Sequence, residues 1–528
     1  MNPPEHNTTG APNILLITTD QQRYDSLGCN GNAVCATPAI DSLAAGGVRY
    51  ERAHTQNVLC MPSRSTILTG QYPGTHGVWN NGVCLPRDAP SVASELRDAG
   101  YATALVGKIH FETIAPHFGE HLRKEGHEPL MVIEHEERDG RAVLWLLPAT
   151  GAAEHRGFDH LELCNHVVSG HHAQWLLEQV GWDRAVTLTE ESAHAFMGIV
   201  DPAASDTAAP QSLYSAMPPE YHSSMWAVER TLGWIDTVEE PRPFFCWLSF
   251  DDPHHPFNPP TAYGRRHAWR ELALPPARPS TRAAIEADLA GKPWQYGAYW
   301  RGEFNHHEGA HSDDRLCDLS DDQLREIMAL TYGMVELIDD ALACLLEGLR
   351  RRGLLQNTHL IFTTDHGELL GDHGLLLKGP FHLDGLLRVP LIWRAPGATA
   401  GVVNDPVGLV DLAPTICSIA GVRPPDWMEG RVLPTSNGSR ERVTTTYESH
   451  YRPELHLRSL FRDGLLVTDY PAIEGAGELY DLDADPYQLR NLWTEPTRRR
   501  LRDDLLADLH DHIVEDTRVE RLPWWAQA

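Results

Sequence analysis

A cysteine, a proline, two serines and an arginine lie close together between residues 60 and 70, in the stretch CMPSRSTILTG. Pro62 suits the first turn of a helix, where a missing N–H costs nothing. The exposed N–H groups of such a turn favour an anion, so we expect the thiolate form of Cys60 to be stabilised. Arg64 follows one turn later and could hold a tetrahedral oxyanion through two hydrogen bonds. The alternative is a buried cysteine beside a helix, the commoner fate of a lone cysteine.

Carboxylates and an imidazole occur at two other places that would suit a metal ion. Asp20-Gln21 and Asp365-His366 each follow a short apolar run directly. Carboxylate and amide oxygens together with an imidazole nitrogen suit Ca²⁺, Mg²⁺ or Mn²⁺, and nitrogen favours the transition metals. Side chains of these types also cap the N-termini of helices. From spacing alone, a metal site and a capping role both stay open.

Four short apolar runs would position these polar groups. They cover residues 13–18, 103–106, 244–250 and 360–364. Continuous apolar runs of this length are typical of strands that are buried on both faces of a mostly parallel sheet. Ligands of such sheets bind outside the carboxyl ends of the strands. We therefore expect one edge of the sheet to carry Asp20, Lys108, His254 and Asp365.

The rest of the pattern predicts a large α/β domain followed by a smaller one. Helices are expected over 37–44, 91–99 and 320–352, the last with apolar residues at helical spacing and a glycine at its end. Residues 111–240 and 258–319 look irregular and are interpreted as insertions. A stretch rich in Gly, Ser, Asn and Pro predicts a boundary between a catalytic domain, 1–435, and a C-terminal subdomain, 436–528. In that subdomain we expect short strands and a helix over 495–512.

The composition argues against several classes of function. The chain has 528 residues and a formal net charge of -29, so we expect no general attraction to nucleic acid or to an anionic membrane. Its nine cysteines are irregularly spaced, which argues against a disulfide framework. The polar N-terminal residues contain no apolar signal segment, so we expect a cytoplasmic protein. A mature chain that had lost its signal would look similar.

The stretch from Cys60 to Gly70 resembles the signature of type I sulfatases, C-x-P-S-R followed by x-x-L-T-G. Further segments are similar to the same family: G-K-x-H at 107–110, P-H-x-P-F at 253–257, D-H-G-E at 365–368 and H-G-L-x-x-K-G-P at 373–380. The similarity runs from residue 13 to about residue 492, outside the two insertions. It implies an alkaline-phosphatase-like α/β sandwich with a large, mostly parallel central sheet, plus a smaller C-terminal α+β domain with an antiparallel sheet.

The resemblance also implies roles for individual residues. In that family a formylglycine-generating modification enzyme oxidises the cysteine, here Cys60, to Cα-formylglycine, whose hydrate is the nucleophile. The expected ligands of one divalent metal are Asp20, Gln21, Cys60, Asp365 and His366, with Ca²⁺ the first choice and Mn²⁺ or Mg²⁺ the alternatives. The expected catalytic residues are Cys60, Arg64, Lys108, His110, His254 and Lys378. The expected substrate contacts are Asn81 and His255, and the latter competes with His254 for the catalytic assignment.

We therefore predict a sulfuric ester hydrolase that acts on a small-molecule sulfate monoester. The nearest alternative is a phosphonate monoester or phosphodiester hydrolase with the same nucleophile, which Asp20-Gln21 fits equally well. Lys108 and His110 favour the sulfatase, because the phosphonate enzymes carry Tyr and Thr in that region. Intact Cys60 and Lys378 disfavour a catalytically silent binding protein of the same fold. The alcohol and the oligomeric state stay open, and a homo-oligomer is compatible with the sequence.

Overall fold

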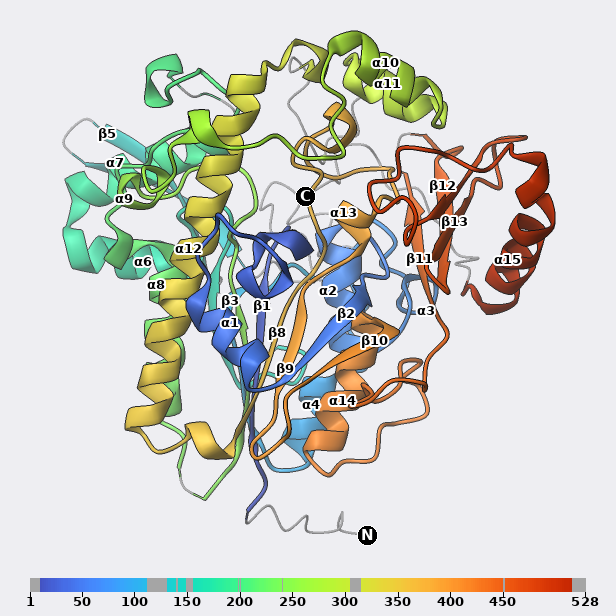
Figure 1. Cartoon of the computed structure of the whole chain (residues 1–528). Helices are drawn as coiled ribbons and strands as arrows, with labels where there is room; N and C mark the ends of the chain where they lie inside the picture. Colours follow the sequence, from blue (N-terminus) through green and yellow to red (C-terminus); the bar gives the residue numbers. More distant parts are fainter. Residues whose placement is uncertain are drawn as a thin grey trace.

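A large, mostly parallel sheet runs through the middle of the molecule in the computed structural model (Figure 1). The structure describes residues 10–111, 131–138, 141–148, 155–197, 199, 201–239, 241–303, 315–449 and 452–514. Within these residues eight strands form the sheet, in the spatial order β10 (Gly401–Gly408), β2 (Val48–His54), β9 (Leu391–Arg394), β8 (Thr358–Thr364), β1 (Asn13–Thr19), β7 (Phe244–Ser249), β3 (Ala102–Lys108) and β6 (His160–Cys164). Of these strands, β9 alone runs antiparallel to its neighbours.

The four apolar runs of the sequence form strands of a mostly parallel sheet, as predicted, and they lie at its centre. Strands β8, β1, β7 and β3 are consecutive neighbours and pair in parallel. Strand β1 shows why its run is continuous: Ile14 and Leu16 pack into the hydrophobic core on one face, and Leu15 and Ile17 into the core on the other. All four side chains are fully buried. The parallel pairing brings the carboxyl ends of the four strands to one edge.

Helices cover both faces of the sheet. One face is covered by α1 (Pro38–Ala45), α8 (Ser223–Ile235) and α12 (Asp321–Arg351), and the other by α2 (Cys60–Thr69), α4 (Val92–Asp98) and α14 (Leu412–Ile419) (Figure 1). The long helix α12 matches the prediction closely. Its N-cap Ser320 accepts a hydrogen bond from the backbone of Gln323, whose side chain accepts one in return, forming a capping box.

The two segments that were expected to be irregular contain several helices, so that expectation is wrong. The described parts of these segments contain α6 (Gly170–Val180), α7 (Trp182–Phe196), α9 (Thr261–Gly264), α10 (Arg282–Ala290) and α11 (Trp294–Trp300), besides α8 and the two-stranded sheet of β4 (Met131–Arg138) and β5 (Arg141–Pro148). The helices α6 and α7 carry a small hydrophobic core of their own. Short helices α3 (Pro73–His76) and α13 (Asp384–Leu387) lie elsewhere in the chain.

A separate antiparallel sheet forms the C-terminal part, at the right of Figure 1. Its strands are β11 (Arg442–Glu448), β12 (His456–Arg462), β13 (Leu465–Asp469) and β14 (Gly477–Asp481). Helix α15 (Arg499–His512) packs Leu505 and Leu509 against one face of this sheet. The predicted helix over 495–512 is thus present, and its α-helical part begins at Arg499. The boundary at residues 435 and 436 stays a prediction.

Candidate active site

The predicted edge of the sheet gathers the expected polar residues. Asp20 follows β1, Lys108 ends β3, and His254 follows β7. Lys108 Nζ donates to Asp20 Oδ2, which links the ends of β3 and β1 across the intervening strand β7. Asp365, directly after β8, accepts a hydrogen bond from the backbone N–H of Gln21 at 3.1 Å. The ends of the four strands therefore form one continuous polar site.

Helix α2 brings Cys60 to this site. Cys60 is its first residue, and the side chain is only 1% exposed. The N–H of Leu59 donates to Asn57 Oδ1 at 2.9 Å, and the N–H of Met61 donates to Asn81 Oδ1 at the same distance. Asn81 thus caps the helix that carries Cys60. The capping contact gives it a structural role that its assignment as a substrate contact did not include.

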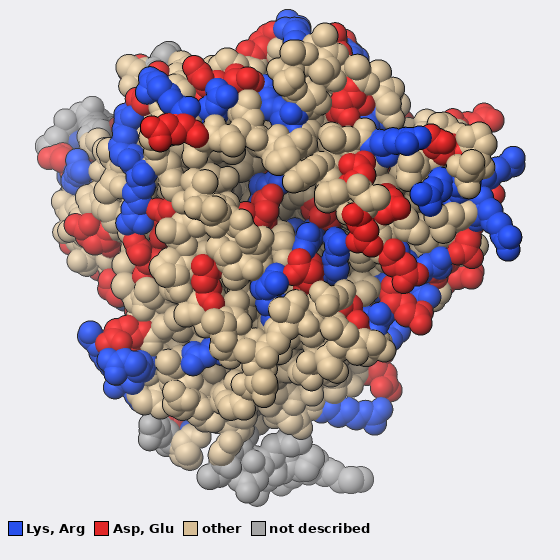
Figure 2. Space-filling model, viewed as in Figure 1, with Lys and Arg blue, Asp and Glu red and all other residues tan. Residues whose placement is uncertain are grey.

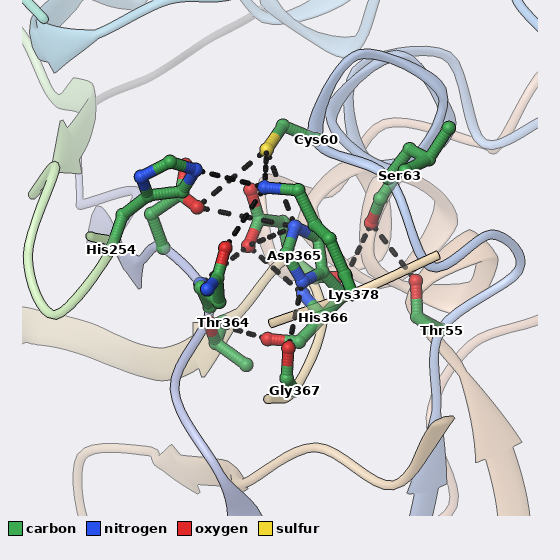
Figure 3. A network of polar contacts seen from close by, with 12 residues as sticks. Thr55, Cys60, Ser63, His254, Thr364, Asp365, His366, Gly367 and Lys378 are labelled. Atoms are coloured by element: carbon green, nitrogen blue, oxygen red, sulfur yellow. Dashed lines mark hydrogen bonds and ion pairs between the residues drawn. The ribbon is translucent and has the colours of Figure 1, made fainter. Parts of the chain in front are cut away.

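Four side chains converge as a metal site requires. One ligand atom from each of Asp20, Cys60, Asp365 and His366 lies within 4.8 Å of the other three, and all four residues are buried. The expected convergence of the two carboxylates is confirmed. Two carboxylates and an imidazole that are held this close in a buried site fit a divalent cation. His366 Nε2 lies 3.2 Å from Cys60 Sγ, and Figure 3 shows both beside Asp365.

Gln21 adopts a left-handed backbone conformation, with φ of 63°. Its side-chain Oε1 accepts a hydrogen bond from Lys378 Nζ at 2.9 Å, and its Nε2 donates to Glu368. These contacts fix the orientation of the amide. Metal ligation by Gln21 stays a prediction.

Arg64 contacts the carboxylates of the metal site. Its Nε donates to Asp365 Oδ2 at 2.8 Å, and its Nη2 donates to Asp20 Oδ2 at 3.0 Å. The remaining acceptors are Ser249 Oγ and the backbone oxygens of Lys108 and Thr19. Because a guanidinium has five N–H donors, these five contacts engage all of them. In this geometry Arg64 positions the two carboxylates, and a role in binding a substrate oxyanion stays a prediction.

The surroundings of Cys60 disfavour its thiolate form. Burial raises its pKa to about 12, and the Asp20 carboxylate adds to the increase while Lys108 and Lys378 oppose it. The expectation of a stabilised thiolate is wrong, because loss of hydration outweighs the favourable field of a helix N-terminus. An unmodified Cys60 would therefore be a poor nucleophile at neutral pH.

Lys378 faces Cys60 directly. Its Nζ lies 3.3 Å from Cys60 Sγ and 2.8 Å from His254 Nε2 (Figure 3). His254 Nδ1 lies 2.6 Å from the backbone oxygen of His255, to which it donates, so Nε2 is left as the acceptor for Lys378. This arrangement separates the two neighbouring histidines. His254 faces Lys378 and Cys60, whereas the ring of His255 lies 3.4 Å from the Gln21 amide.

Lys108 has a second partner that the sequence analysis missed. Its Nζ lies 2.5 Å from the Nε2 atom of His166, which follows β6. The expected catalytic residue His110 is buried close by in a left-handed backbone conformation, with φ of 47°. Its Nδ1 has no hydrogen-bond partner among the residues that the structure describes. Burial, reinforced by the Lys108 charge, holds the pKa of His110 well below its usual value.

A cavity of about 660 Å³ borders the site through Gln21 and Glu368. Its three arginines pair with the protein's own acids: Arg23 with Asp372 at 2.8 Å, Arg52 with Asp483 at 3.3 Å, and Arg388 with Glu51 at 2.7 Å. Figure 2 shows acidic and basic side chains intermixed on this face, with a hollow near its middle. These cations are already neutralised, so the cavity is not an obvious second anion site.

The family described as Sulfatase matches residues 12–120 and 147–422, which is more than half of the chain. The chain belongs to the sulfatase family. A second family, described as N-sulphoglucosamine sulphohydrolase, C-terminal, matches residues 371–515. Sulfatases in general use a metal ion and a formylglycine, and the buried group around Cys60 has the residues for both.

Named sulfatases align with nearly the whole chain. An arylsulfatase of Clostridium perfringens is 28% identical over 497 residues, which cover 91% of this chain and 90% of that protein. A choline-sulfatase of Rhizobium meliloti is 27% identical over 507 residues, which cover 93% of this chain and 84% of that protein. The predicted enzyme class, a sulfuric ester hydrolase, is confirmed.

The fold has close counterparts among solved structures. The phosphonate monoester hydrolase of Agrobacterium radiobacter superposes with a TM-score of 0.75 at 24% identity, and the match covers 95% of each chain. This likeness confirms the alkaline-phosphatase-like fold and says nothing of the substrate.

Among the described residues of this sulfatase, no helix has the length and apolar character needed to cross a bilayer.

Proposed function

We propose that this sulfatase cleaves a small-molecule sulfate monoester at the site around Cys60. The observation that supports this most strongly is the position of Lys378 Nζ, 3.3 Å from Cys60 Sγ in a site where both are buried. When present, a divalent cation at Asp20, Asp365 and His366 would neutralise charge on the sulfuryl oxygens, and the hydrated aldehyde made from Cys60 would supply the attacking oxygen. Ca²⁺ is our first choice of cation because two carboxylates dominate the ligand set.

The chain's own residues supply charge and protons on two sides of Cys60. Lys108 donates to Asp20 and is placed to bind a nonbridging oxygen of the sulfuryl group. Lys378 is placed on the leaving-group side, where a proton is needed as the alcohol departs. His254 accepts a hydrogen bond from Lys378 at 2.8 Å and holds the ammonium toward Cys60. Arg64 holds the carboxylates of Asp20 and Asp365 in fixed positions, since it forms an ion pair with each of them.

The alternative substrate class is a phosphonate monoester or a phosphodiester. The pairs Asp20-Gln21 and Asp365-His366 fit it equally well and keep it as a second candidate. Lys108 and His110 favour the sulfate ester, because the phosphonate enzymes carry Tyr and Thr in that region.

A substrate panel tests the proposal. The protein is produced together with a formylglycine-generating enzyme, then assayed on aryl sulfates, choline sulfate, sugar sulfates and phosphonate monoesters. We expect the highest kcat/KM for a sulfate ester. Cys60→Ala should abolish turnover. Cys417→Ala, which alters a buried cysteine of the hydrophobic core, should leave turnover unchanged. A phosphonate preference would select the alternative, and turnover by Cys60→Ala would refute the proposal.

The cation is tested separately. The purified protein is stripped with a chelator and titrated with Ca²⁺, Mn²⁺ or Mg²⁺, and thermal unfolding and turnover are followed together. A cation that binds the folded state raises the unfolding temperature, and at a given concentration the increase is larger the more tightly it binds. We expect Ca²⁺ to restore both properties in the wild type and neither in Asp365→Asn. Activity that survives complete removal of divalent ions would contradict the metal assignment.

A further inference from the structure

A column of stacked rings leads from the surface to the catalytic site. Phe196, at the end of α7, is 40% exposed, and its ring stacks on His166 with centroids 5.9 Å apart and an interplanar angle of 7°. His166 stacks on His254 at 3.7 Å, and His254 stacks on His255 at 4.0 Å. Three segments that are distant in sequence supply these rings, and His254 lies near the middle of the column.

Each catalytic lysine is paired with one histidine of this column. Lys378 Nζ lies 2.8 Å from His254 Nε2, and Lys108 Nζ lies 2.5 Å from His166 Nε2. An ammonium group donates and cannot accept, so both Nε2 atoms are acceptors in these contacts. Each ring is therefore neutral and carries its proton on Nδ1. The two lysine–histidine pairs thus lie side by side, because the rings of His166 and His254 stack on each other.

Among the residues that the structure describes, Lys108 is the only hydrogen-bond partner of His166. Its Nδ1 is buried and has no hydrogen-bond partner within the described part of the chain. The residue lines a cavity of about 40 Å³, which also touches Asp251 and Ser215. An ordered water needs roughly 15 Å³ of such space, so the cavity can hold one beside the ring. Water there would satisfy Nδ1 and leave Nε2 to Lys108.

We propose that His166 is a positioning residue for sulfate-ester hydrolysis, which fixes Lys108 toward the nonbridging oxygens of the substrate. The inference rests on the proposed function of the Cys60 site. An ammonium has three N–H groups, and the acceptors for two of those on Lys108 are Asp20 and His166. The third N–H of the ammonium then points in one direction and is not free to rotate. The long, flexible side chain of Lys108 is thus held in one geometry before substrate arrives.

The test uses substitutions that separate the acceptor from the ring. His166→Phe keeps a ring for stacking and removes the acceptor, whereas His166→Gln keeps an acceptor near the Nε2 position and removes the ring. We expect kcat/KM to fall about 10²-fold in His166→Phe, because a small misplacement of a catalytic group costs on that order. His166→Gln should recover most of this loss. His172→Phe is the matched control, because His172 lines the same cavity and contacts Tyr221 instead.

A double-mutant cycle shows whether His166 acts through Lys108. If it does, His166→Phe in a Lys108→Ala background causes no further loss, since the positioned group is already absent. The loss in His166→Phe should also be equal for good and poor leaving groups. A calorimetric titration with inorganic sulfate in a Cys60→Ala background adds a readout without turnover, and His166→Phe should weaken that binding.

Several outcomes would overturn the inference. Wild-type kcat/KM in His166→Phe, or losses that simply add to those of Lys108→Ala, would mean that His166 only fills space. Should His166→Phe fail to fold, His166→Asn takes its place, because the shorter amide does not reach Lys108, and wild-type activity in that variant would be equally decisive. Failure of the proposed function looks different: the wild type would not hydrolyse any sulfate ester, or Cys60→Ala would.

Discussion

Lys378 Nζ lies 3.3 Å from Cys60 Sγ, although 318 positions separate the two residues in the chain. The contact places a cation next to the atom that the sulfatase modification replaces by oxygen. The same ammonium also contacts Gln21 Oε1 and His254 Nε2, so its orientation is fixed by three buried groups. A lysine held in this way can donate a proton at one defined position.

Replacing Lys378 should make the rate depend on the leaving group. In Lys378→Ala, kcat should fall steeply for alkyl sulfates and much less for an activated aryl sulfate, because a good leaving group gains little from a positioned acid. Lys108→Ala is the comparison, and its loss should vary less across the series. The measurement is kcat for a set of sulfate esters that span leaving-group pKa. Equal losses for all esters in Lys378→Ala would assign Lys378 a different role.

Arg64 offers a test of the carboxylate site. With the cation removed, Arg64→Met leaves Asp20 and Asp365 buried without their shared partner, and we expect the free energy of unfolding to fall by about 3–5 kcal/mol. Adding the cation should stabilise this variant more than the wild type, since the ion replaces the lost positive charge. The readout is the unfolding temperature with and without the ion.

The matched control for Arg64 is Arg23→Met. This change removes ion pairs to Asp25 at 2.7 Å and to Asp372 at 2.8 Å, and neither acid is one of the four converging residues. The instability of this control should not depend on the cation. Identical stabilisation by the ion in Arg64→Met and in the wild type would mean that Arg64 does not compensate the metal-site carboxylates.

Much of this site could be predicted because its strands are encoded locally. The apolar runs that end at Asp20, Lys108, His254 and Asp365 are buried on both faces of the sheet, so each run identified its own strand. Parallel pairing then fixed the shared edge. Contacts within that edge could not be predicted in the same way. The hydrogen bond from Arg64 to Asp365 joins residues 301 positions apart, and only the folded chain shows that it engages the guanidinium.

His166 was missed for a different reason. It follows β6, whose sequence HLELC includes polar residues and does not resemble a continuous apolar run. The rule that polar groups at strand ends form the site would have found His166 had that strand been recognised. The raised pKa of the Cys60 thiol was equally hidden, because burial is set by the tertiary structure and not by the first turn of α2.

Glu478 should contribute strongly to the stability of the C-terminal sheet. Its carboxylate accepts hydrogen bonds from Tyr296, Tyr470 and Tyr480, and it is fully buried. Glu478→Leu leaves three buried hydroxyls without this acceptor, so we expect unfolding free energy to fall by at least about 3 kcal/mol. Tyr470→Phe removes one donor and should cost about 1 kcal/mol. Denaturant unfolding measures both, and a smaller loss in Glu478→Leu than in Tyr470→Phe would contradict this assignment.

His382 should make the fold sensitive to acid. Burial lowers the pKa of His382 from 6.5 to about 3, so the folded ring stays neutral while the unfolded chain takes up a proton. The contribution of the neutral His382 ring to folding stability is therefore fully present above pH 6.5 and is lost as the pH falls toward 3. In His382→Gln the slope of unfolding free energy against pH should be shallower over this range by about 1.4 kcal/mol per pH unit. Parallel slopes for the variant and the wild type would contradict the prediction.

The central claim is that turnover of a sulfate ester depends on an oxidised Cys60. Mass spectrometry of the peptide that contains Cys60, taken from a preparation with measured sulfatase activity, tests it most directly. Conversion of the thiol to an aldehyde makes the residue about 18 Da lighter. We predict that the lighter peptide is present and that its fraction rises in proportion to specific activity across preparations. An active preparation in which every Cys60 peptide has the mass of the unmodified thiol would contradict the claim.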